Sequence, residues 1–203
     1  MKLSFILCAV LCVTSPLCFA QDRKAPFREE KKAPAQPVTG KVHPGFKEPV
    51  LTKQPADSKL RVYRLVIAPV WGPLYCMRVQ NTAAGATITV KHLKYEKENP
   101  WKELVEEKPV TLTAAEFAEF EALIAKTGYE KMGPKDYGVD GDIWALEVSK
   151  AGYFHKAERW CPNAFDPEKK GTAAYAAAFR WVADKAQVTA KITNKSHSVF
   201  DRN

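Results

Sequence analysis

Alternating apolar and polar residues mark the first part of the predicted folded region. In residues 61–68 the side chains of Tyr63, Leu65 and Ile67 share one phase, which predicts a β-strand. Residues 74–80 and 86–95 repeat the pattern, with short turns rich in glycine, proline and asparagine between the runs. Because these links are too short for crossover connections, the sequence predicts an antiparallel meander.

Apolar residues at helical spacing predict two helices. The first begins after Thr113, has Glu116 three residues later as a capping box requires, and ends at Gly128. The second runs from about Lys169 to Ala186 and is rich in alanine, which suits close packing.

A β-hairpin is predicted between the two helices. Residues 142–149 and 153–160 are rich in aromatic and β-branched residues, and Lys150-Ala151-Gly152 separates them. The predicted element order is therefore β-β-β-α-β-β-α. This order is typical of an α+β domain with an antiparallel sheet of about five strands and both helices packed on one face. We expect the other face to be partly open to a peptide or partner.

The length of the hairpin turn decides which polar side chains meet. A two-residue turn places Trp144 on the same face as His155 and Arg159, with Glu147 on the opposite face. A three-residue turn with a bulge at Gly152 instead places Glu147 beside His155, which is the arrangement that an acid/base pair needs. The sequence is compatible with both turns.

The two ends of the chain differ in composition from the predicted domain, residues 60–187. Residues 1–20 combine Lys2, an apolar run and small residues before Gln21, which predicts a cleaved secretory signal and an exported protein, periplasmic or extracellular. That apolar run is shorter than the ~20 residues of a membrane span, so no transmembrane segment is predicted. Residues 21–59 read as a disordered linker rich in proline and lysine, and residues 188–203 as a flexible basic tail.

The formal net charge of +8 comes mostly from these ends, since residues 58–187 hold 19 basic and 17 acidic residues. A nucleic-acid-binding domain usually concentrates positive charge on a folded face, so this distribution argues against nucleic-acid binding. The basic ends predict at most a weak attraction to an anionic surface.

Two cysteines, Cys76 and Cys161, follow the predicted signal. An exported pair is a candidate disulfide that would close a loop of about 85 residues. The sequence has no C-x-x-C motif, no zinc-ligand spacing and no phosphate or dinucleotide loop, so we expect neither a metal nor a cofactor.

Three residues of the hairpin, Glu147, His155 and Arg159, are the catalytic candidates. In a small periplasmic hydrolase, Glu147 or His155 would act as the base and Arg159 would hold an anionic substrate group. The binding candidates are Trp144, Arg159, Trp160 and Trp101. Because no catalytic motif is present, the leading hypothesis is a non-catalytic exported module that binds a protein, peptide or envelope polymer. An envelope inhibitor or protective protein is a further alternative.

The motif D-G-x-x-W-x-L-E over residues 140–147, followed by Y-x-H-x-x-x-R-W-x-P over residues 153–162, resembles small exported bacterial domains of unassigned function. In those domains one helix beginning L-T-A-x-E precedes the motif and another follows it, as predicted here. The resemblance covers roughly residues 60–186. It implies an α+β fold and an exported setting, and it transfers no catalytic residue.

Overall fold

The computed structural model describes residues 42–98, 100–132, 138, 141–164 and 166–195. The predicted signal, the first half of the predicted linker and the last eight residues of the predicted tail, 196–203, lie outside the described residues.

The described residues form one antiparallel sheet of seven strands with three α-helices and two short 3-10 helices, which confirms the α+β class. The strands are β1 (Arg61–Pro69), β2 (Leu74–Thr82), β3 (Gly85–Leu93), β4 (Leu104–Glu106), β5 (Val110–Leu112), β6 (Asp142–Lys150) and β7 (Tyr153–Trp160). The helices are η1 (Pro44–Phe46), α1 (Ala114–Lys126), η2 (Tyr129–Lys131), α2 (Ala173–Lys185) and α3 (Thr189–Lys195).

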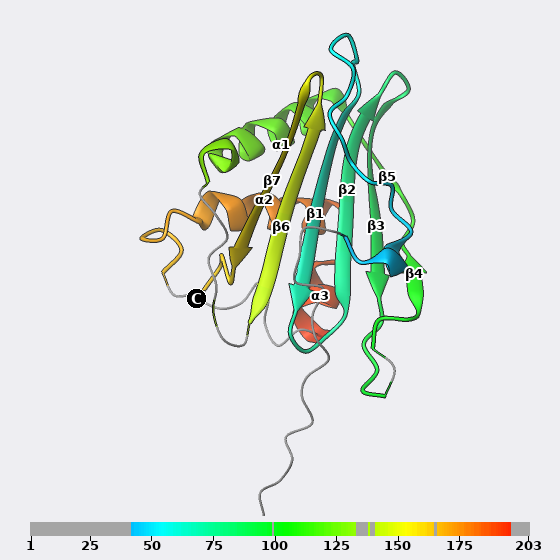
Figure 1. The fold of residues 1–203 in the computed structure, drawn as a ribbon, viewed down its shortest axis with the longest axis vertical. Helices are drawn as coiled ribbons and strands as arrows, with labels where there is room; N and C mark the ends of the chain where they lie inside the picture. The colour runs from blue at the N-terminus through cyan, green and yellow to red at the C-terminus, as the bar shows by residue number, and fades with distance from the viewer. Residues whose placement is uncertain (1–41, 99, 133–137, 139–140, 165, 196–203) are drawn as a thin grey trace, which may run out of the picture. The chain divides into compact units, whose positions relative to one another are not determined.

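The strand order is β4-β3-β2-β1-β6-β7, and β5 also pairs with β3 (Figure 1). The expectation of about five strands was too low, because β4 and β5 form in the charged stretch that precedes α1. Each has only three residues. Strands this short do not display the alternation by which longer strands are recognised.

The hairpin of β6 and β7 has a two-residue turn. Lys150 pairs with Tyr153 across Ala151 and Gly152, and Gly152 has a positive φ of 62° that favours glycine. The three-residue turn that would put Glu147 beside His155 is therefore not formed.

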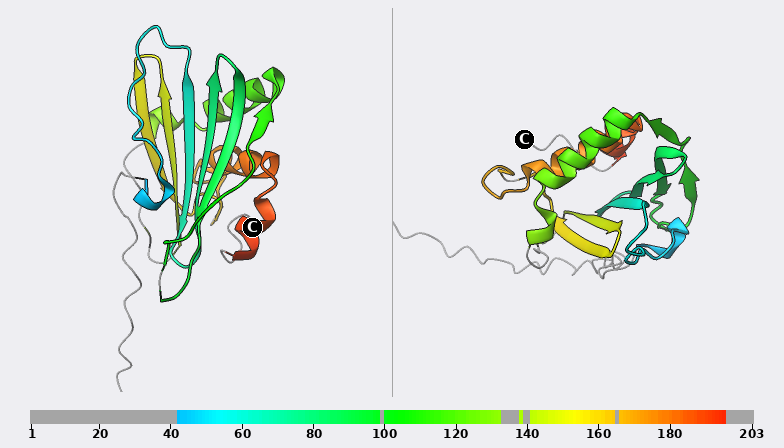
Figure 2. Two further views of the ribbon diagram at one scale, coloured as in Figure 1. Left: turned by 90° about the vertical axis from the view of Figure 1, so that its right-hand side faces the viewer. Right: turned by 90° about the horizontal axis from the view of Figure 1, so that it is seen from above.

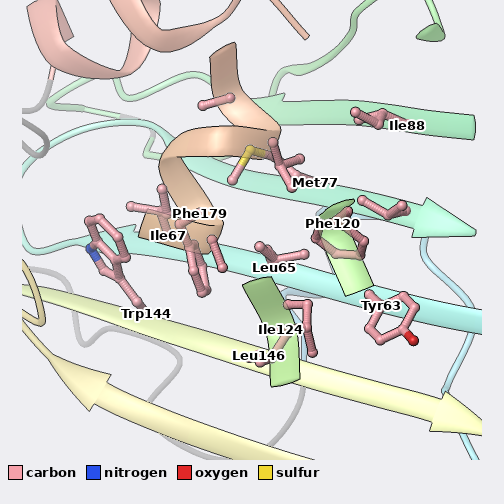
Figure 3. Packing of buried hydrophobic residues seen from close by; sticks show 14 of the residues in the cluster. Tyr63, Leu65, Ile67, Met77, Ile88, Phe120, Ile124, Trp144, Leu146 and Phe179 are labelled. Carbon is pink, nitrogen blue, oxygen red and sulfur yellow. The ribbon is translucent and has the colours of Figure 1, made fainter. Parts of the chain in front are cut away.

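Side chains of α1 and α2 pack with one face of the sheet to form the main core (Figure 3). Phe120 of α1 meets Tyr63 edge to face at 5.1 Å between ring centroids, and Phe179 of α2 lies 5.0 Å from Trp144. The predicted capping box at Thr113 is present at the start of α1. These contacts bury the apolar phase of the long strands.

The other face of the sheet carries residues 42–59, here called the strap (Figure 2). The prediction of a disordered linker therefore fails from residue 42 onward, because Phe46 of the strap is fully buried against the sheet. At the other end, Val188 and Ile192 are also buried in the core. The domain thus extends past the predicted limits of residues 60–187 at both ends.

The predicted disulfide is not formed, because no bond joins Cys76 and Cys161, which are both buried. Cys76 lies on β2, whereas Cys161 follows β7, and β1 and β6 lie between those strands. Three strand spacings amount to about 14 Å. A disulfide requires Cα atoms within about 7 Å, so the strand order keeps the two sulfurs apart.

Candidate functional site

A cleft lies at the end of the sheet where the β2–β3 and β6–β7 turns meet the start of β1. It consists of two adjoining cavities of about 490 and 410 Å³, both lined by Lys150. Two glycines shape this end of the sheet. Gly128 after α1 and Gly152 in the β6–β7 turn both have a positive φ, which lets the chain reverse direction beside the cleft.

The larger cavity has a basic and polar lining. Lys59, Arg61 and Lys150 are its charged residues, and the remaining lining residues are small or polar: Ser58, Asn81, Thr82, Ala83 and Ala151. None of the residues lining this cavity is acidic. It therefore favours an anionic or hydroxyl-rich ligand group.

The second cavity lies between β1, the end of α1 and η2. Glu121 of α1 lines it, accepts a hydrogen bond from the Tyr63 hydroxyl at 2.6 Å, and forms an ion pair with Arg61 at 2.6 Å. Because Arg61 lines one cavity and Glu121 the other, this ion pair stands at their boundary.

Three tyrosines near the cleft stay protonated at physiological pH. Burial raises the pKa of Tyr63, with a further rise from its hydrogen bond to Glu121. Burial also raises the pKa of Tyr129, which lines the second cavity, and of Tyr153 beside it. These phenols are neutral hydrogen-bonding groups, so the positive charge of the cleft comes from its lysines and Arg61.

Of the three catalytic candidates, Glu147 lies on one face of the sheet, while His155 and Arg159 lie on the other. Glu147 is held by Arg64 of β1, whose Nε donates to Glu147 Oε2 at 2.8 Å. The structure therefore does not bring Glu147 and His155 together as an acid/base pair.

His155 stacks on Tyr153 at 6.2 Å between ring centroids and lies 5.6 Å from the ring of Tyr129. Its Nε2 atom is buried without a hydrogen-bond partner. Arg159, next to the last residue of β7, donates through Nη1 to the carbonyl oxygen of Glu158 at 2.6 Å. His155 and Arg159 thus share a face without converging on the cleft lining.

The candidate binding tryptophans occupy three different places. Trp144 is fully buried in the main core. Trp101 is 5% exposed, and its Nε1 donates to the Gly72 carbonyl oxygen at 2.9 Å, so its ring is not presented to solvent. Trp160 is half-buried at the end of β7, with the Lys170 ammonium 5.5 Å from its ring centroid. None of them lines the cleft.

The cleft residues Lys59, Arg61 and Glu121 were not anticipated from the sequence. Lys59 and Arg61 are neighbours at the start of β1, but Glu121 lies on α1 and Lys150 on β6, so no short motif unites the cleft residues. The one signal available was the pair of turns at Ala83 and Ala151, which the hairpin pattern brings to the same end of the sheet.

Comparison with known proteins adds no assignment. A scan against models of protein families gives no match for this chain, and a search of curated protein sequences gives no significant similarity. Within the part of the chain that the structure describes, no helix has the length and apolar character needed to cross a bilayer. The same residues contain no cluster of histidine, cysteine or carboxylate side chains suited to a metal ion.

Proposed function

We propose that this chain is an exported, non-catalytic module that binds an anionic stretch of an envelope polymer in the cleft at the end of the sheet. The carrying observation is the pair of adjoining cavities that share Lys150, the larger of which is lined by three cations and no carboxylate. Export rests on the leader-like residues 1–20.

The composition of the cleft suits a ligand that carries both charge and hydroxyl groups. Lys59 and Lys150 supply ammonium groups, of which Lys150 Nζ also lies 3.5 Å from Glu130 Oε1, while Asn81 supplies an amide for hydrogen bonding. Arg61 is already paired with Glu121, so it serves as a fixed donor at the boundary of the two cavities. An extended polymer could occupy both cavities at once.

Binding is tested with the chain from residue 21 on, using isolated cell-wall glycan in a co-sedimentation assay and labelled polyglutamate in fluorescence anisotropy. We expect glycan binding that weakens with salt, and a loss of about ten-fold in affinity for Lys59→Glu and for Lys150→Glu. Lys102→Glu is the matched control, because Lys102 is an exposed lysine before β4, away from the cleft lining.

Equal binding by the cleft variants and the Lys102→Glu control would place the interaction in the tails and overturn the proposal. Preference for polyglutamate over the glycan would instead identify an acidic peptide as the ligand and refute the polymer assignment.

A further inference from the structure

One aromatic side chain anchors the first part of the strap, while Gln54 near its end pairs with Ala151 of the hairpin turn. Phe46 is 0% exposed. It belongs to a small apolar cluster separate from the main core, together with Leu74, Cys76, Leu93 and Trp101. The Trp101 indole closes this pocket while its Nε1 is held by Gly72.

Two residues after Phe46, the carboxylate of Glu48 is surrounded by three cationic side chains. The Glu48 side chain is 1% exposed and lies 3.0 Å from Arg78 Nη1, 3.0 Å from Lys91 Nζ and 3.8 Å from Arg64 Nη1. These cations come from β2, β3 and β1, and Arg64 lies directly opposite Arg78. Like charges opposite each other destabilise a strand pair, and the carboxylates that offset this repulsion are Glu48 and, on Arg64, Glu147.

The same cations also hold the backbone of the strap. Lys91 Nζ donates to the Phe46 carbonyl oxygen at 3.2 Å, and Arg64 Nη1 donates to the Pro49 carbonyl oxygen at 2.7 Å. Backbone contacts of this kind are available to any polypeptide. Sequence selection at this face therefore rests on the Phe46 and Glu48 side chains.

Several features distinguish the strap from a permanent part of the core. A cavity of about 40 Å³ remains between Phe46 and the strands beneath it, enough for a water molecule. The Nε atom of Arg78, one of the cations around Glu48, is buried without a hydrogen-bond partner. The strap joins β1 through residues 55–57, which are exposed. When the strap leaves, the side chains of Arg64, Arg78 and Lys91 can be hydrated, which lowers the cost of exposing this face relative to a purely apolar one.

We propose that this face of the sheet is a binding site for an extended segment of a partner polypeptide that presents an aromatic residue and, two residues later, a carboxylate. The strap occupies this site in cis and is displaced by the partner segment. This proposal concerns the face opposite α1 and α2 and does not rest on the function proposed for the cleft.

The partner's middle residue contributes through its backbone conformation. Lys47 is exposed and has a positive φ of 52°, which is unfavourable for a residue with a side chain. Glycine or asparagine between the aromatic residue and the carboxylate should therefore bind more tightly than lysine. A higher affinity of the peptide with glycine at this position would distinguish binding in the strap conformation from simple charge attraction.

The test uses the chain from residue 21 on and fluorescein-labelled peptides with the sequence of residues 42–54. We expect Phe46→Ala and Glu48→Gln, each of which loosens the strap, to raise peptide affinity about ten-fold over the unmodified chain. A peptide carrying Glu48→Lys should not bind, and one carrying Lys47→Gly should bind more tightly. Near-UV circular dichroism establishes that each variant is folded.

A second measurement avoids strap variants. Excess peptide added to the unmodified chain should accelerate proteolytic cleavage within the strap, and the Glu48→Lys peptide should not. The proposal would be overturned if a folded variant bound the unmodified peptide and the Glu48→Lys peptide with equal affinity, or bound neither of them. Concentration-dependent dimers that the peptide dissociates would also overturn it, by identifying the strap of a second copy as the partner.

Discussion

Arg64 and Glu147 face each other across β1 and β6 as a buried ion pair, in which Arg64 Nε donates to Glu147 Oε2 at 2.8 Å. Both side chains are only 4% exposed, so neither charge has bulk water as an alternative partner. Removing Glu147 leaves the buried Arg64 charge with only the more distant Glu48 carboxylate, 3.8 Å from Nη1, as its counter-ion.

Glu147→Gln should therefore lower the free energy of unfolding by about 3 kcal/mol in urea denaturation. The exposed pair of Lys94 and Glu103 provides the comparison, since its side chains are 42% and 56% exposed. Glu103→Gln should cost less than about 1 kcal/mol. Similar losses at both positions would show that burial does not control the contribution of the Arg64–Glu147 pair.

The second prediction concerns acid stability. The Lys185 ammonium of α2 and the cap at Thr113 lower the pKa of Glu116 from 4.5 to about 2. Because the folded-state pKa is below the unfolded value, this contribution is complete above pH 4.5 and disappears as the pH falls toward 2. In melting curves, Glu116→Gln should lose stability near neutral pH, and its difference from the unmodified chain should shrink across that window. Glu168→Gln, on an exposed loop, should show no such convergence.

A third prediction concerns the start of the strap. His43 Nδ1 accepts the Gly45 N–H at 3.1 Å, and burial lowers the pKa of His43 below 6.5. A lowered folded-state pKa means that strap stability is complete above pH 6.5 and falls as the pH drops below it. Proteolysis within the strap should accelerate between pH 7.5 and pH 5. His43→Asn keeps an acceptor without titrating, so its cleavage rate should vary little with pH. A pH response retained in His43→Asn would assign the effect to another group.

The cysteines provide a fourth prediction. Burial raises the pKa of the Cys76 thiol, and both Cys76 and Cys161 are about 1% exposed. In the chain from residue 21 on, which holds no other cysteine, neither should react with Ellman's reagent in the native state at pH 8, and both should react in denaturant. Denatured protein without reactive thiols would establish a disulfide and contradict the strand order described here.

The fifth prediction explains a glycine in the hairpin motif. A Cβ on Gly141 would lie 2.5 Å from Cys161 Sγ and 2.6 Å from Trp160 Nε1. Gly141→Ala should therefore cost about 2 kcal/mol by thermal or urea denaturation. Gly85 also has a positive φ but nothing within 4 Å of its Cβ position, so Gly85→Ala isolates the backbone cost of about 1 kcal/mol. Equal losses would show that the close contacts of Gly141 are relieved by small shifts.

Long, regular elements could be predicted from the sequence. The strands β1, β2, β3, β6 and β7 each have eight or nine residues, enough for alternation to be visible. Helix α1 was recognisable from its capping box at Thr113. The length of the hairpin turn could not be predicted, because Ala151-Gly152 and a three-residue bulge fit the same local composition.

The group of cations around Glu48 could not be predicted because its parts are distant in the chain. Arg64, Arg78 and Lys91 occupy the strand phase opposite the main core, which also holds apolar residues, so no strand considered alone indicates a cluster of cations. The segment that buries them is rich in proline and lysine, and such composition is typical of a linker. A phenylalanine and a glutamate two residues apart in that segment were the only local sign of docking.

The order in which the chain is made gives Glu48 of the strap a role during synthesis. The strap leaves the ribosome before any strand that supports it, and Glu147 follows Glu48 by almost a hundred residues. Glu48 is therefore present when β1, β2 and β3 first pair, whereas Glu147, the other carboxylate on Arg64, arrives only with β6. The carboxylate of the strap thus offsets the repulsion between Arg64 and Arg78 in the half-made sheet, so three strands can pair before the hairpin of β6 and β7 exists.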